Sequence, residues 1–223
     1  MKNLPIIAVR LLPVILLFIL CNAAFTQTII NSNEFVGDDK YNASDAARFE
    51  ASATVNDKIY QAMWVSTWSP GLLSAWQTKT MMNLARDNNV NAIFPEVRKT
   101  GDAYYISATE PRATNIHATY EDPLADVLQS AHDVSEGKQY IEVHAWIVPY
   151  RVRTSGQTIP AGHVLKDHPD WVTYDQAGVK SEEVLDPGIP EVQDYLVDVI
   201  LEIVKNYDVD GIHFDYIRYF GNN

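Results

Sequence analysis

The chain has 223 residues, 47% of them hydrophobic, and a formal net charge of −12 at pH 7. This length supplies apolar material for one ordinary core and too little for two large domains. The acidic balance argues against a nucleic-acid-binding protein, because such binding depends on clustered Lys and Arg that neutralise phosphates. A neutral partner such as an uncharged glycan suits this composition better.

The first 24 residues have the order of parts of a secretory signal peptide. Lys2 and Arg10 precede an apolar run over residues 11–20, and small residues follow at 22–24. The run is too short for a membrane span of about 20 residues. We therefore predict cleavage after Ala24 and export to the periplasm, envelope or exterior, with no membrane span afterwards. An uncleaved anchor or a buried helix is the alternative.

Cys21 is the only cysteine. Leu20 stands before it, where a lipid-modified cysteine usually follows a small residue, so lipid anchoring is disfavoured. Cleavage after Ala24 would leave a mature chain with neither a disulfide framework nor a cysteine nucleophile. Residues 25–56 are polar without a sustained apolar period, which predicts a flexible lead-in before an ordered domain at 57–223.

Short apolar runs alternate with helical patterns through this domain. The predicted strands are residues 59–68, 90–97, 140–148 and 209–214. The predicted helices are residues 74–88, residues 122–132 with Gly137 placed to stop the helix, and residues 190–203, which start at Pro190 and repeat apolar residues at helical spacing. Such alternation implies parallel pairing and the α/β class.

Within the α/β class, a (β/α)8 TIM barrel fits best. A doubly wound sheet usually carries a glycine-rich phosphate turn after its first strand, and none follows Trp68. Long loops rich in Tyr, His, Trp and Pro follow the second and third strands, as expected where barrel strands carry an active site. Because a TIM barrel needs about 250 residues, we predict an incomplete barrel holding about the first four β/α units, from a truncated frame or a fragment.

The fourth strand ends in the strongest catalytic candidate, Asp215. Alternate residues of a strand face the same side, so Gly211, His213 and Asp215 share one face while Ile212 and Phe214 point toward the helices. An unpaired carboxylate is costly to bury. A carboxylate at the barrel-facing strand end is better explained as a nucleophile or an acid/base group.

Structural roles remain open for the charged residues around this strand. Asp215 has an alternative role as the ion-pair partner of Arg218, and Asp210, which precedes the strand, is expected to make a turn or salt bridge. His213 fits a core histidine as well as a contact to a sugar hydroxyl.

The ends of the other strands supply candidates for sugar binding. The third strand places His144 and Trp146 on one face, and Tyr150 and Arg151 follow it. Trp146, Tyr150 and Trp68 carry rings of the kind that stack on sugars, although core packing explains each of them equally well.

The second strand ends in charged residues on one face. An ion pair between Glu96 and Arg98 is the favoured interpretation, and Asp102 lies in the turn that follows. Glycoside hydrolysis uses two carboxyl groups. The partner of Asp215 is expected beyond residue 223, with Glu96 or Asp102 as the alternative.

These residues resemble the glycosyl-hydrolase-like family ten proteins, secreted bacterial barrels often attached to the envelope. The match runs over most of residues 60–219, and it includes Met63-Trp64-Val65-Ser66-Thr67, Gly101-Asp102-Ala103-Tyr104-Tyr105, His144-Ala145-Trp146, Pro149-Tyr150-Arg151 and Gly211-Ile212-His213-Phe214-Asp215. The resemblance implies a TIM barrel that hydrolyses glycosidic bonds, in some members those of peptidoglycan glycan strands stripped of peptides. Asp215 matches the strand-four aspartate, which is the nucleophile position of similar α-amylase-like barrels. Pro95-Glu96 and Val148 depart from the family pattern near the expected site.

Three functions follow from these patterns. The first is an O-glycosidase without cofactor or metal that acts on a polysaccharide or oligosaccharide. Its catalytic residue is Asp215, and its sugar subsite is formed by Trp68, Arg98, Asp102, His144, Trp146, Tyr150, Arg151 and His213. The second is an inactive remnant that binds glycan. The third is a metal hydrolase in which His144, His213 and Asp215 hold zinc, although the sequence lacks a closely spaced ligand pair.

Overall fold

The computed structural model describes residues 59–219. The predicted signal peptide at residues 1–24, with Cys21, and the predicted lead-in at residues 25–56 lie outside the described residues. No helix in the described part of the chain is long and apolar enough to cross a membrane.

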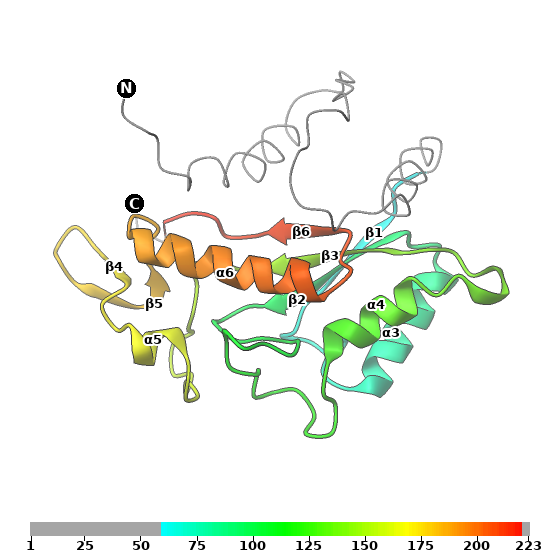
Figure 1. Ribbon diagram of the computed structural model, residues 1–223, viewed down its shortest axis with the longest axis horizontal. Coiled ribbons are helices and arrows are strands. Elements are labelled where there is room, and N and C mark those ends of the chain that lie inside the picture. Colours follow the sequence, from blue (N-terminus) through cyan, green and yellow to red (C-terminus); the bar gives the residue numbers. More distant parts are fainter. Residues whose placement is uncertain (1–58, 220–223) are drawn as a thin grey trace, which may run out of the picture. The chain divides into compact units, whose positions relative to one another are not determined.

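Within residues 59–219, four parallel strands form the main sheet (Figure 1). These strands are β1 (Ala62–Val65), β2 (Ala92–Arg98), β3 (Glu142–Ile147) and β6 (Gly211–Phe214). They lie side by side in chain order, and each neighbouring pair is parallel. The helices between them are α3 (Ala75–Asp87), α4 (Pro123–Ala131) and α6 (Pro190–Asn206). The predicted order of strands and helices is confirmed, with shorter strands than the sequence indicated.

Local sequence explains where these helices begin. Ser74 caps α3, because its hydroxyl accepts a hydrogen bond from the N–H of Gln77. Asp122 caps α4 in the same way through the N–H of Ala125, at 3.0 Å. The helix ends at Ala131, earlier than predicted, and Gly137 lies instead in the short 3-10 turn η2 (Ser135–Gly137).

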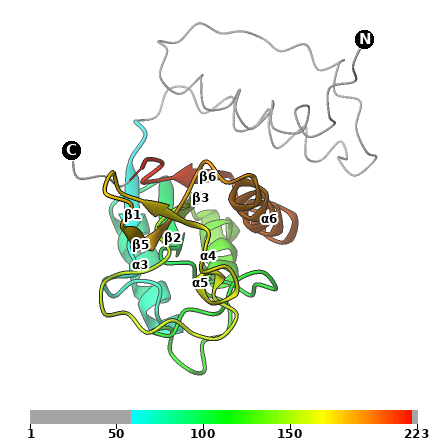
Figure 2. The same cartoon turned by 90° about the vertical axis from the view of Figure 1, so that its left-hand side faces the viewer.

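The helices cover one face of the sheet (Figure 2). Side chains that alternate along the strands point into this core, and the strand residues there are Val65, Ile93, Val97, Val143, Ala145 and Ile147. Ile212 and Phe214 of β6 also pack against it, as the alternation predicted. The other face of the sheet is therefore free to carry the remaining strand side chains.

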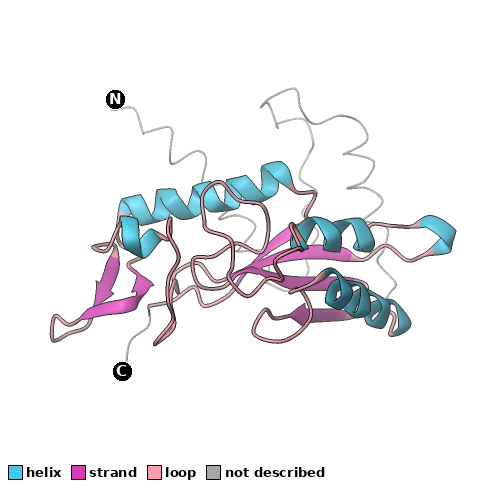
Figure 3. Ribbon diagram, turned by 90° about the horizontal axis from the view of Figure 1, so that it is seen from below, coloured by secondary structure: helices cyan, strands magenta, loops and turns pink. Residues whose placement is uncertain are grey.

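The segment between β3 and α6 contains structure that the sequence did not predict. It holds the short helix α5 (Val164–Asp167) and an antiparallel hairpin of β4 (Val172–Tyr174) and β5 (Lys180–Leu185). Val152, Val164 and Leu185 of this segment form an apolar cluster with Val192 and Leu196 of α6. The hairpin lies beyond the C-terminal ends of the parallel strands (Figures 1 and 3), so it borders the edge where a barrel carries its active site.

Candidate active site

The sheet face opposite the helices carries aromatic, histidine and carboxylate side chains. They are Trp64 of β1, Phe94 and Glu96 of β2, His144 and Trp146 of β3, and His213 of β6. The strand register sets them in levels, with His144 opposite Gly211 and with Glu96, Trp146 and His213 side by side. In a TIM barrel this face is the interior, and its C-terminal end is the site of chemistry.

Ring contacts fix the orientation of His213. Its Nε2 atom accepts a hydrogen bond from the Trp64 indole N–H at 3.3 Å, and its ring meets Phe94 edge-on at 4.9 Å. Burial lowers the pKa of His213 below its ordinary value of 6.5, and the neighbouring Asp215 charge opposes this shift. Because Nε2 accepts the bond from Trp64, the proton of the neutral imidazole is on Nδ1.

Asp215 is half-buried directly after β6. Its backbone N–H donates to the carbonyl of Ile147 at 3.0 Å, which holds the residue beside the end of β3. Its Oδ1 atom accepts from the N–H of Tyr216 at 2.7 Å. The Arg218 guanidinium lies over the Tyr216 ring at 4.8 Å, so this arginine stacks where the alternative interpretation expected an ion pair with Asp215.

The structure corrects the predicted role of Arg98. Its guanidinium is fully buried and pairs with Glu110, with Nη2 2.7 Å from Oε1. It also donates to the carbonyl oxygens of Val148 and Pro149. The burial of Arg98 leaves no surface for a sugar, so this residue positions the strand ends.

Glu96 does not pair with Arg98 as expected. Its Oε2 atom accepts from the N–H and hydroxyl of Thr67, both at 2.8 Å, and from the hydroxyl of Ser66 at 3.1 Å. The strand register shifts between Glu96 and Arg98, which is the irregularity that redirects Arg98 toward Glu110.

The Asp102 carboxylate also has a structural role. Its Oδ1 atom accepts from the N–H and hydroxyl of Thr100, at 3.0 and 3.1 Å, and closes the turn after β2. His163, which the sequence reasoning missed, is fully buried behind this turn, with its Nε2 atom 2.9 Å from the Thr100 carbonyl. The glycine at position 101 was the one hint in the sequence that something packs closely against this turn. Its φ is 67°, and a Cβ atom there would lie 2.8 Å from Nε2 of His163.

Tyr150 and Arg151 hold the hairpin to the end of β3. Tyr150 packs against the apolar cluster of the hairpin segment, and burial raises its pKa. The backbone of Arg151 forms an isolated antiparallel β-bridge with Val184 of β5, and its Nη2 atom lies 3.6 Å from Oε2 of Glu183. Their predicted contact with sugar stays a prediction.

Trp68 and Trp146 were predicted to stack on sugar, and that role stays a prediction. Trp68 follows β1 at the C-terminal end of the sheet and is 60% exposed. Trp146 lies edge-on to His213 at 6.4 Å, and its buried indole N–H finds no hydrogen-bond acceptor among the described residues. The structure adds Lys99, which directly follows β2 and lies over the Trp68 ring at 4.4 Å.

The zinc hypothesis finds no support in this geometry. His144 is opposite Gly211, so Asp215 lies four residues further, roughly 13 Å along the strand. Its Nε2 atom is instead 3.0 Å from Glu142 and 3.2 Å from the hydroxyl of Tyr60. No cluster of three metal-ligating side chains occurs within residues 59–219.

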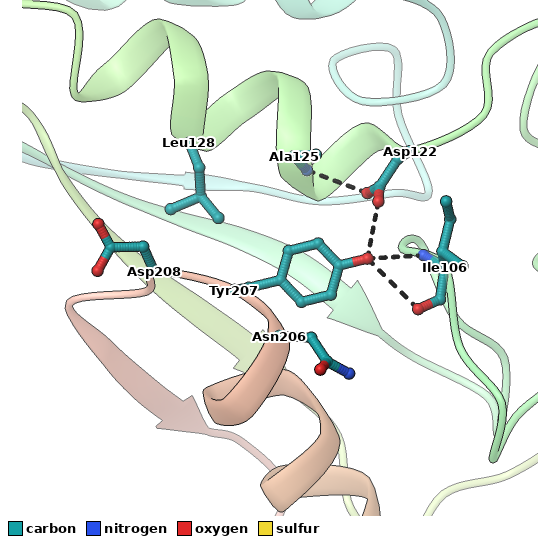
Figure 4. A pocket seen from close by; sticks show the side chains of 7 residues that line it. All are labelled: Ile106, Asp122, Ala125, Leu128, Asn206, Tyr207 and Asp208. Carbon is teal, nitrogen blue, oxygen red and sulfur yellow. Dashed lines mark hydrogen bonds between the residues drawn. The ribbon is translucent and has the colours of Figure 1, made fainter. Parts of the chain in front are cut away.

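A hollow of about 480 Å³ lies on the helical side, between α4 and the end of α6 (Figure 4). The Tyr207 hydroxyl crosses it to donate to Asp122 at 2.7 Å and to accept from the N–H of Ile106 at 2.9 Å. These bonds tie α6 to α4 and to the loop after β2. The hollow is thus a structural junction on the opposite side of the sheet from Asp215.

Residues 59–223 match the protein family described as Glycosyl hydrolase-like 10. The chain belongs to this family. The glycosyl hydrolase YngK of Bacillus subtilis (strain 168) is 31% identical over 178 residues, which cover 72% of this chain and 33% of YngK. The glycosyl hydrolase DigH of Escherichia coli (strain K12) is 35% identical over 143 residues, which cover 56% of this chain and 30% of DigH. The chain thus spans about a third of the length of these relatives.

A solved structure supports the same fold. The crystal structure of a hypothetical protein from Ruminiclostridium thermocellum ATCC 27405 superposes with a TM-score of 0.54 at 19% identity, covering 71% of this chain and 78% of that chain. The parallel strands, taken in chain order with helices on one face, are consecutive units of a (β/α)8 barrel. The predicted family is confirmed, and so is the predicted barrel-type fold of the described residues.

Proposed function

We propose that this protein is a glycoside hydrolase that cleaves O-glycosidic bonds of a polysaccharide, with Asp215 as one of two catalytic carboxyl groups. The observation that carries the proposal is the position of Asp215, half-buried at the C-terminal end of β6 on the barrel-facing side of the sheet. Catalytic residues of TIM-barrel enzymes come from these strand ends.

The second carboxyl group is proposed to come from outside the described residues. Glu96, Asp102 and Glu110 are all buried, and each already accepts hydrogen bonds from fixed protein donors. A general acid must offer its proton to the glycosidic oxygen, and a nucleophile must reach the anomeric carbon. Asp215, unlike these three carboxylates, is only half-buried, and it fits the role of nucleophile or base.

The substrate that we propose is the glycan strand of peptidoglycan, which the protein would cleave outside the cytoplasm. It rests on the motifs shared with family ten and on the signal-peptide pattern of residues 1–24. Trp68, Trp146 and Tyr150 would supply ring faces for successive sugars, and His213 would bind a hydroxyl beside Asp215.

Replacement of Asp215 by Asn tests the proposal. Glycan strands are incubated with the protein, and released reducing ends are counted by chromatography and mass spectrometry. We expect the Asp215→Asn protein to lose about 10²- to 10⁴-fold in rate. Asp198→Asn on the exposed side of α6 is the matched control and should keep full activity. Full activity in the Asp215→Asn protein would contradict the assignment.

Glycan binding without cleavage is the second candidate function. The exposed indoles of Trp64 and Trp68, at 56% and 60%, favour it. In that case the wild-type protein binds glycan strands and releases no reducing ends, and the Asp215→Asn protein binds them equally well.

A further inference from the structure

The backbone turns sharply directly after Asp215. Tyr216 has a φ of 53°, in the left-handed region that bulky residues rarely adopt, because Cβ there lies too close to a backbone carbonyl oxygen. The N–H of Arg218 then donates to the carbonyl of Tyr216 at 2.9 Å, which closes a second tight turn. The chain therefore leaves the end of β6 through a strained residue.

The place of Tyr216 in the fold distinguishes it from the other left-handed residues. Among the described residues other than glycine, Asn89 and Glu136 are the only others with a positive φ. Both are exposed and lie in connections that lead into β2 and β3, at the N-terminal edge of the sheet. In a barrel that edge serves stability, whereas the C-terminal edge, where Tyr216 lies, carries the chemistry. Strained backbone often marks a functional site.

The left-handed conformation of Tyr216 is coupled to the peptide group that joins it to Asp215. The N–H of this peptide group points at Oδ1 of Asp215, at 2.7 Å. When a peptide group rotates inside a turn, ψ of the residue before it and φ of the residue after it change together, as between type I and type II turns. A negative φ at Tyr216 would therefore turn this N–H away from the carboxylate.

Asp215 is thereby held at two points. Its own N–H donates to the carbonyl of Ile147 at 3.0 Å, and its Oδ1 accepts from Tyr216. Within residues 59–219, Oδ2 of Asp215 accepts no hydrogen bond. A nucleophile or base must present one oxygen to the substrate in a defined direction, and a misplacement of about 1 Å can lower the rate by about 10²-fold.

We propose that Tyr216 is a positioning residue that acts through its backbone: its left-handed conformation fixes Oδ1 of Asp215 and leaves Oδ2 to react. The inference rests on the proposed glycosidase function and adds a residue to its site. The Tyr216 ring has a separate role, because the Arg218 guanidinium lies over it at 4.8 Å and helps to hold the turn closed. Asp215 requires the backbone conformation of Tyr216 and not its ring.

Four substitutions at position 216 separate the backbone from the ring. Tyr216→Gly and Tyr216→Asn remove the ring and tolerate a positive φ, since glycine has no Cβ and asparagine is enriched in this region. Tyr216→Ala and Tyr216→Val remove the ring and disfavour a positive φ, valine most strongly because it is β-branched. Asn89→Val is the matched control, because it disfavours a positive φ at the N-terminal edge of the sheet.

The rate of reducing-end release from glycan strands is the first measurement. We expect Tyr216→Gly and Tyr216→Asn to keep kcat close to that of wild type. Tyr216→Val should lose about 10- to 100-fold in kcat with little change in KM, and Tyr216→Ala should lie between. Asn89→Val should lower the melting temperature and leave kcat unchanged. This order follows the tolerance for a positive φ, which the loss of ring packing alone would not produce.

An NMR titration of His213 is the second measurement, and it does not depend on activity. Burial lowers the pKa of His213 and the Asp215 charge opposes this shift, so the midpoint reports whether the carboxylate stays nearby. The midpoint should match wild type in Tyr216→Gly and Tyr216→Asn. It should fall in Tyr216→Val toward the value of Asp215→Asn. If Tyr216→Val fails to fold, Tyr216→Ala against Tyr216→Asn gives the same comparison.

The failure of this inference is distinguishable from the failure of the proposed function. Equal losses of kcat in all four variants would assign the effect to the ring and overturn the inference. A wild-type kcat and a wild-type midpoint in Tyr216→Val would overturn it as well. Both results leave the glycosidase proposal standing, because wild type still cleaves glycan. No reducing ends from any protein, with a midpoint that falls in Tyr216→Val and not in Tyr216→Gly, would refute the proposed function and support the positioning of Asp215.

Discussion

The carboxylate of Glu110 closes off the guanidinium of Arg98 from solvent, with both side chains 0% exposed and Nη2 2.7 Å from Oε1. The hydroxyl of Tyr195 on α6 donates to the same carboxylate. Arg98 also donates to the carbonyl of Pro149 at 2.9 Å. The pair therefore joins the end of β2 to the loop after β3 and to α6, which frames the mouth of the candidate site.

Replacement of Glu110 by Gln should strongly destabilise the fold, because it leaves the buried guanidinium without its counter-charge. We expect the free energy of unfolding to fall by about 3–5 kcal/mol. Urea denaturation followed by tryptophan fluorescence measures this change.

An exposed ion pair provides the control for Glu110. Arg153 and Glu182 lie 3.3 Å apart, and the Glu182 side chain is 78% exposed. Glu182→Gln should change the free energy of unfolding by less than about 1 kcal/mol. Similar losses in both variants would show that burial does not set the strength of the Arg98 pair.

Asp210 joins β6 to the N-terminal end of β3. It accepts hydrogen bonds from the N–H of Val143 at 2.8 Å, from the Tyr140 hydroxyl at 2.7 Å and from His132 at 3.0 Å. Burial raises the pKa of Asp210, but the bonds from His132, Val143 and Tyr140 outweigh it and bring the pKa below 3.8. The earlier expectation of a structural role is confirmed.

This lowered pKa predicts a loss of stability in acid. A carboxyl whose folded pKa is below its unfolded pKa stabilises the fold above the unfolded value, near 3.8, and that contribution is lost as the pH falls through the folded pKa. The free energy of unfolding of wild type should therefore decline below about pH 4. Asp210→Asn should be less stable than wild type at pH 6, and the difference should narrow at pH 3. A constant difference between pH 6 and pH 3 would contradict this.

Sequence patterns predicted the elements that depend on local and periodic signals. Alternation along β3 and β6 correctly placed His144 with Trp146 and Gly211 with His213, because regular strands keep a period of two. The same rule failed for Arg98, since the register shifts after Glu96. A bulge of this kind leaves no mark in the order of polar and apolar residues.

The remaining misses involve contacts between distant residues. Glu110 lies in a loop without periodicity, so nothing in the sequence connects it to Arg98 or to Tyr195. The hairpin of β4 and β5 contains Lys180, Glu182 and Glu183, which are poor strand formers, and its stability comes from packing. Contacts between distant parts of the chain therefore determine both the formation of the hairpin and the partners of Arg98 beside the site.

The protonation of His213 reports directly on Asp215. Burial lowers the pKa of His213, the charge of His144 lowers it further, and the charge of Asp215 raises it. In an NMR titration, the midpoint for the His213 ring should lie below 6.5. Asp215→Asn should lower it further, because the opposing charge is removed. An upward shift, or none, would place the Asp215 carboxylate away from this imidazole.

Gly211 and His144 are predicted to be coupled across β3 and β6. A Cβ atom at position 211 would lie 2.5 Å from Nδ1 of His144, so the ring would have to move. That ring stacks on Phe94 at 5.1 Å and contacts Glu142 at 3.0 Å, which restricts such a movement. Gly211→Ala should therefore lower the free energy of unfolding by about 1–3 kcal/mol through overpacking.

A double-mutant cycle separates this clash from an intrinsic effect of alanine in the strand. His144→Ala removes the ring that the new methyl group would meet, so Gly211→Ala should have little effect on the free energy of unfolding in that background. The coupling energy should then account for most of the loss seen with Gly211→Ala alone. Additive losses in the double variant would mean that the methyl group is accommodated without contact to His144, and that the close approach of β3 and β6 at this level is not what requires glycine.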